Sequence, residues 1–126
     1  MLCHMQDIDI LHFWFEELSD KQHFVKDPTL DANMRTRFGL TLEAAARCEL
    51  SAWRASPQGR LAEILVLDQF SRNIFRDTPR VFAQDALALV LAQELVAGGH
   101  DQRLTPKQRA FAYMPFMHSE SLPVHE

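Results

Sequence analysis

The sequence has few cysteines and no long apolar run, and each lack argues against a class of protein. Its two cysteines, Cys3 and Cys48, are too few for a disulfide framework and favour a reducing, cytoplasmic location. No stretch approaches the roughly 18 apolar residues typical of a membrane span. The start, MLCHMQDIDI, carries acids where a secretory signal would carry positive charge. We therefore expect an untargeted soluble protein without a membrane partner.

The sequence also lacks an excess of basic over acidic residues. Thirteen Lys and Arg residues stand against seventeen Asp and Glu residues, for a formal net charge of −4. Phosphate binding needs a basic surface. The arginines between Arg54 and Arg80 are interleaved with Glu63, Asp68 and Asp77. We predict no nucleic-acid partner.

The signatures of metal and nucleotide enzymes are absent from the sequence. It has no HExxH, no CxxC and no glycine-rich phosphate loop. Its histidines are scattered without the spacing of metal ligands. We therefore predict neither a metal site nor a cofactor.

Four N-cap residues stand directly before proline and predict helix starts. An N-cap oxygen accepts an orphan backbone N–H, and proline at the first helical position has no N–H to lose. No strand-like alternation of useful length appears. The length of 126 residues fits one domain with its own core, so we predict a single all-α domain over residues 1–126. The four pairs are Asp27-Pro28, Ser56-Pro57, Thr78-Pro79 and Thr105-Pro106.

The expected helices form stacked antiparallel hairpins. Pro28 and Pro79 lie 51 positions apart and Pro57 and Pro106 lie 49 apart, which favours stacked pairs over a symmetric bundle. Phe24 is expected to anchor the polar connection before the second helix, and Phe82 to lie on the apolar surface of the fourth. The predicted ranges are Asp7–Leu18, Pro28–Trp53 with an alternative break near Cys48–Ser51, Gly59–Arg76, Pro79–Ala97, and Pro106 to the break at Pro115.

One face of the third helix, GRLAEILVLDQFSRNIFR, is apolar in its first half and polar in its second half. We expect the apolar half of this face to be buried. At 100° per residue, Asp68 and Arg72 continue the line of Leu61 and Leu65. A buried carboxylate needs a partner, and Arg72 at i,i+4 can supply one to Asp68. The polar set is either a structural network or the lining of a pocket. Gln69, Asn73 and Arg76 accompany it.

A second unusual stretch is Tyr113–Glu120, where Pro115 breaks the fifth helix before a His-Ser-Glu cluster. Polar groups at a helix end often serve binding or catalysis. His118 could act as a general acid or base, with Asp68 or Glu120 as its carboxylate partner. Adjacency of Ser119 to His118 does not indicate a hydrolase triad, which is defined by geometry.

LDQFSRNIFR at 67–76 and YMPFMHSE at 113–120 resemble a bacterial family, domain of unknown function 924. The resemblance runs nearly end to end and implies a tetratricopeptide-like right-handed α-α superhelix, with no stated activity. Family members usually have proline where this chain has Ser71, so its third helix is expected to be straighter. The family generally continues past the His-Ser-Glu motif. We therefore expect a C-terminally truncated chain whose apolar surface is covered by a partner copy.

Three functions remain open, ranked in this order. The first is a binding module for a peptide or small anionic ligand, because guanidinium groups pair carboxylate and phosphate bidentately. The second is a structural or assembly protein in which the polar cluster only fixes helix packing. The third is an acid–base or hydrolytic enzyme. The candidate site residues are Asp68, Gln69, Arg72, Asn73, Arg76, His118 and Glu120.

Overall fold

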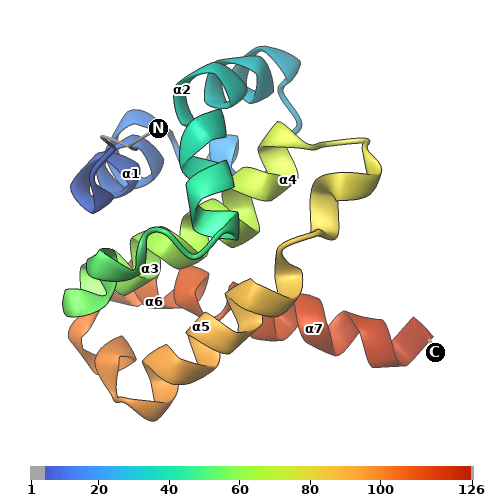
Figure 1. The fold of residues 1–126 in the computed structure, drawn as a ribbon. Helices are drawn as coiled ribbons and strands as arrows, with labels where there is room; N and C mark the ends of the chain where they lie inside the picture. Colours follow the sequence, from blue (N-terminus) through green and yellow to red (C-terminus); the bar gives the residue numbers. More distant parts are fainter. Residues whose placement is uncertain (1–4, 126) are drawn as a thin grey trace.

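The computed structural model describes the backbone of residues 5–125 and the side chains of residues 5–119 (Figure 1). Within residues 5–125 the chain is helical without a β-strand, which confirms the all-α prediction. Short 3₁₀ and π turns join the helices. The α-helices are α1 (Asp7–His12), α2 (Pro28–Ala46), α3 (Pro57–Leu65), α4 (Ser71–Ile74), α5 (Asp85–Ala97), α6 (Pro106–Ala112) and α7 (Met114–His125). The shorter elements are η1 (Phe13–Glu17), η2 (Lys21–His23), η3 (Ser51–Ala55), η4 (Val66–Phe70), η5 (Pro79–Phe82) and η6 (His100–Arg103).

All four predicted N-caps are confirmed. The Asp27 carboxylate accepts backbone N–H groups from the first turn of α2, and Ser56 accepts from Gly59 at the start of α3. Thr78 and Thr105 accept in the same way, each followed by proline. The cap at Thr78 opens the 3₁₀ turn η5, so the helix predicted to start at Pro79 begins only at Asp85, as α5. A cap with proline therefore marked where a helical turn begins, but not the kind of helix that follows.

The segment from α3 through η4 to α4 is the centre of the molecule. α1 packs on α3, α2 packs on η4 and α4, and α5 and α6 pack on α3 from the other side (Figure 1). Every residue from Leu61 to Ser71 is buried. The segment therefore has neighbours on all sides, which explains why its polar side chains find partners from several helices.

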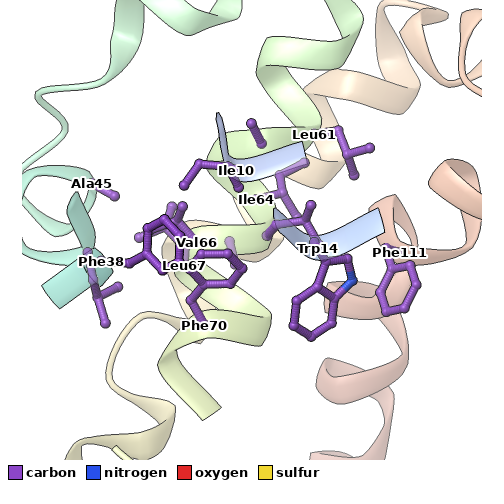
Figure 2. Packing of buried hydrophobic residues seen from close by; sticks show 14 of the residues in the cluster. Ile10, Trp14, Phe38, Ala45, Leu61, Ile64, Val66, Leu67, Phe70 and Phe111 are labelled. Carbon is purple, nitrogen blue, oxygen red and sulfur yellow. The ribbon is translucent and has the colours of Figure 1, made fainter. Parts of the chain in front are cut away.

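Aromatic side chains fill the core between these layers. Figure 2 shows Phe38 and Phe70 meeting on one side of the central segment and Trp14 meeting Phe111 on the other. The ring centroids of Phe38 and Phe70 are 5.1 Å apart, and those of Trp14 and Phe111 are 5.6 Å apart. Such tilted and edge-to-face pairs add about 0.5–1.5 kcal/mol each beyond the area they bury.

Two expected helices end or begin elsewhere. α2 ends at Ala46 instead of Trp53, because the chain turns through Cys48, whose φ of 61° lies in the left-handed region. α5 ends at Ala97, as expected, and is followed by Gly98 and by Gly99, whose φ of 74° lies in the left-handed region. Phe82, expected on the apolar surface of a helix, is exposed in η5 because the α-helix begins only after it.

The expectation that Phe24 anchors the connection before α2 is wrong. Its side chain is 69% exposed, and its ring meets only the rings of Phe111 and His23 at the rim of the core. The 3₁₀ turn η2 instead directs His23 inward, where its ring stacks on Trp14 at 4.4 Å and its Nε2 donates to the Trp14 carbonyl at 2.6 Å. Burial lowers the pKa of His23 below its ordinary value of 6.5.

We expect the buried His23 to make the protein less stable in mild acid. In the unfolded chain this imidazole takes up a proton near pH 6.5, while the folded state resists protonation. Its contribution is therefore complete above pH 6.5 and is lost as pH falls from 6.5 toward the lowered folded value, by at most about 1.4 kcal/mol per pH unit. Urea unfolding across this range measures the slope. His23→Phe should flatten it, whereas His12→Gln, at an exposed histidine, should not. An equal slope in the His23→Phe protein would contradict the assignment.

Candidate functional site

A π-helical turn lies where the sequence predicted a straighter helix. Val66–Phe70 (η4) interrupts the α-helical geometry between α3 and α4 without a proline or glycine. The wider turn shifts the residues after it relative to a regular 3.6-residue helix. Asp68 therefore stays buried beside Leu65, while Arg72 emerges toward α5. Single π turns of this kind occur often at functional sites.

Asp68 is the hub of the first polar network. Its side chain is only 1% exposed and accepts hydrogen bonds from three side chains. His118 Nδ1 and Arg72 Nη1 each lie 2.8 Å from its Oδ1, and Gln69 Nε2 lies 3.2 Å from its Oδ2. An ionised carboxylate can only accept, so the His118 proton resides on Nδ1. Asp68 thus fixes both the orientation and the tautomer of this imidazole.

Arg72 joins this hub to α5. The predicted i,i+4 pair with Asp68 is confirmed, and its Nη1 and Nη2 also donate to the two carboxylate oxygens of Asp85 at 2.9 and 3.1 Å. Its guanidinium carbon lies 5.3 Å from the centre of the Phe82 ring. The donors of Arg72 are therefore largely occupied by two carboxylates of the protein itself.

A cavity of about 180 Å³ opens beside this network, between η4, α5 and α7. Its polar end holds two carboxylates and the imidazole, and its other wall is aliphatic. A small pocket with an apolar wall and a few convergent polar groups is the usual form of a ligand site. The lining residues are Asp68, Asp85, Ala86, Leu89, Pro115, His118 and Ser119.

Asn73 and Arg76 belong to a second network, centred on Asp31 of α2. Asn73 Nδ2 donates to Asp31 Oδ1 at 2.9 Å, and Arg76 Nε donates to Asp31 Oδ2 at 2.7 Å. Asp31 and Asn73 are buried. This network joins α2 to α4 and does not line the cavity, so the predicted set divides into two groups with different neighbours.

The sequence placed His118 at the broken end of the fifth helix, but in the structure His118 lies inside a separate helix. A new helix, α7, begins at Met114, and Pro115 occupies its first turn, where its missing N–H has no helical partner to lose. Tyr113 Oη donates to Asp101 Oδ2 at 2.6 Å just before α7 begins. This hydrogen bond lowers the pKa of the Asp101 carboxyl and raises that of Tyr113. Glu120 also belongs to α7, but its side chain lies outside the described residues.

The sequence interpretation missed Asp31 and Asp85, the acids that complete the two networks. Both lie in the first turn of a helix, where an acid is favoured by the helix dipole alone. The available signal was the number of arginines near the third helix, which exceeds the acids beside them. Buried guanidinium groups without local partners require carboxylates from other helices.

Two general findings bear on the chemistry. Among the described residues, no group of three or more His, Cys, Asp and Glu side chains is arranged to hold a metal ion. In the same part of the chain, no helix has both the length and the apolar character needed to cross a membrane.

Comparison with known proteins identifies relatives without an assigned activity. The family model described as "Bacterial protein of unknown function (DUF924)" matches residues 10–126. A solved structure of a protein of unknown function from Agrobacterium tumefaciens is 40% identical and superposes with a TM-score of 0.84. The match covers 89% of this chain and 63% of that protein, so this chain spans less than two thirds of its length. No curated protein matches the chain.

Proposed function

The chain belongs to a bacterial family of unknown function, DUF924, and we propose that its cavity binds a small neutral or cationic molecule. His118 exchanges a proton with this molecule as a general acid or base. The observation that carries the proposal is the 2.8 Å hydrogen bond from His118 Nδ1 to the buried Asp68 carboxylate, at the wall of the cavity. A base oriented by a buried carboxylate is a recurring catalytic arrangement.

The chemistry of the imidazole follows from this hydrogen bond. With Nδ1 hydrogen-bonded to Asp68, Nε2 is the ring nitrogen that we propose exchanges a proton with the bound molecule. His118 can therefore accept a proton from a bound molecule and return it. We propose proton abstraction or hydrolysis as the reaction class.

The charges around the cavity favour a neutral or cationic ligand over an anionic one. Asp68 and Asp85 line the cavity, whereas Arg72 does not. Arg72 and Arg76, the predicted anion-binding residues, already pair with Asp68 and Asp85 and with Asp31. An anion there would have to displace a carboxylate that is already bound. A peptide or small anion held by Arg72 and Arg76 is therefore the less favoured form of the binding hypothesis.

The arrangement beyond the all-helical fold is part of this proposal. We propose that α2 through α7 stack as a tetratricopeptide-like superhelix, which the packing of α2, α5 and α6 on the central segment supports. A cytoplasmic location, suggested by the low cysteine content, and association with a second copy also remain proposals. Light scattering at high protein concentration tests the association with a second copy, and a monomer would contradict it.

Three probes with the same apolar tail test the proposed ligand: butylamine, 1-butanol and butyrate. We expect butylamine to shift the NMR signals of Ala86, Leu89 and Ser119 most, because its ammonium faces two carboxylates. His118→Gln should weaken this binding about tenfold, the size of one lost charge-assisted hydrogen bond. His12→Gln, at an exposed histidine, is the control. Binding that is unchanged in His118→Gln, or butyrate binding most tightly at the cavity, would overturn the proposal.

A further inference from the structure

Two of the arginines that no carboxylate of the described residues pairs with lie in the same groove. Arg37, Arg47, Arg54, Arg72 and Arg76 each form an ion pair with an acid. Arg35 and Arg80 form none among residues 5–119, yet both line the same groove. Two uncompensated cations at one place form a local positive potential on a protein of net negative charge.

The groove lies between α2 and the segment from α4 to η5, away from the cavity of His118. Its volume is about 250 Å³. Leu40, Ile74 and Phe75 give it an apolar floor, and Leu40 is 66% exposed. The complete lining is Arg35, Thr36, Gly39, Leu40, Glu43, Ile74, Phe75 and Arg80.

Both guanidinium groups are held in place by contacts that leave donors available. Arg35 Nε and Nη2 donate to the Ile74 carbonyl at 3.4 and 3.1 Å, which leaves Nη1 for another acceptor. The Arg80 guanidinium stacks on the Phe75 ring, 4.2 Å from its centre. Stacking uses the face of the group and leaves the N–H donors at its edge, the geometry that pairs carboxylate and phosphate oxygens.

The one acid of the groove does not neutralise these cations. Glu43 lies within 3.7 Å of Arg47, its i,i+4 neighbour on α2. The lining residues therefore carry two guanidinium groups against one carboxylate that is shared with a third. A bound oxyanion would balance the remaining charge, and an attached apolar group would cover Leu40 and Phe75.

We propose that this groove binds an oxyanion carried on a short apolar group, with the oxygens on Arg35 and Arg80 and the apolar part on Leu40 and Phe75. The shared chemistry is a terminal carboxylate or phosphate monoester. The site is independent of His118 and requires no reaction there. It also assigns an anionic ligand to arginines other than those the sequence favoured.

Butyrate and butyl phosphate test the site, with 1-butanol and butylamine as matched probes of the apolar group alone and of the opposite charge. Both anions should shift the amide signals of Gly39, Leu40 and Phe75 in a saturable way, and 1-butanol and butylamine should not. Tighter binding of butyl phosphate would identify a phosphate site, and tighter binding of butyrate a carboxylate site. Arg80→Gln should weaken binding about tenfold, the loss of one charge-assisted contact. Arg103→Gln, at an exposed arginine outside the groove, should not.

Gly39 provides a variant that does not remove either arginine. A Cβ at this position has no atom within 4 Å, so Gly39→Glu adds a carboxylate to the groove lining without a clash at Cβ. It should abolish binding of both anions, while Gly39→Ala, the control for adding a side chain, should retain it. The proposal is overturned if 1-butanol shifts the same signals as much as butyrate, if neither anion binds, or if Arg80→Gln and Gly39→Glu bind like the unaltered protein.

Discussion

Replacing Asp68 with alanine should lower the free energy of unfolding by about 3–5 kcal/mol, the range for breaking a buried ion pair. Asp68 is buried and accepts from Arg72, Gln69 and His118. Removing it leaves these donors without their acceptor, although Arg72 keeps its two hydrogen bonds to Asp85. Urea unfolding measures the loss. Asp20→Ala, which removes the exposed partner of Lys107, should leave the free energy of unfolding nearly unchanged.

The same variant separates a functional site from a structural joint, that is, a polar network that only holds the helices together. A joint predicts the loss of stability and nothing more. The proposed acid–base site also predicts that His118 loses its fixed Nδ1–H tautomer, which imidazole ¹⁵N shifts report when the ring is neutral. Butylamine binding should weaken as well. If Asp68→Ala leaves the His118 tautomer and butylamine affinity unchanged while stability falls, the network is a joint.

The helix starts could be predicted from sequence because their cause is local. Asp27, Ser56, Thr78 and Thr105 each satisfy a backbone N–H two or three residues away, next to a proline that suits the first turn. The i,i+4 pair of Asp68 and Arg72 is also local. Such interactions depend on a few neighbouring residues, so they can be predicted from the sequence without knowledge of the fold.

The partners from other helices could not be predicted in this way. Asp31 and Asp85 reach Arg76 and Arg72 only after α2 and α5 have packed on the central segment. The choice between His23 and Phe24 as the buried residue depends on the 3₁₀ turn of η2. The π turn at Val66–Phe70 has no proline or glycine to mark it. The position of the cavity follows from these tertiary choices, so the sequence supplied its polar residues but not their grouping.

Replacing Arg54 with alanine should be as destabilising as Asp68→Ala, by about 3–5 kcal/mol. Arg54 Nε and Nη2 donate to the two carboxylate oxygens of Glu63, both at 2.8 Å, and this hydrogen bonding raises the pKa of Arg54. Glu63 is 1% exposed on α3, so the variant leaves a carboxylate in the core without its partner. Arg47→Ala is the matched control because Arg47 pairs with Glu49 in the same way at the surface. Arg47→Ala should leave the free energy of unfolding nearly unchanged, because exposed ion pairs contribute little.

A double variant shows whether the loss comes from the stranded charge. Arg54→Met with Glu63→Leu removes both charges and keeps most of the side-chain volume. Exchange of a buried ion pair for apolar residues of similar volume is often neutral or stabilising by about 1–4 kcal/mol. We therefore expect the urea midpoint of the double variant to equal or exceed that of the unaltered protein. It should lie far above the midpoint of Arg54→Ala. If the double variant is as unstable as Arg54→Ala, the ion pair itself stabilises the core. If Arg54→Ala loses no more than Arg47→Ala, Glu63 regains water or another partner when Arg54 is removed.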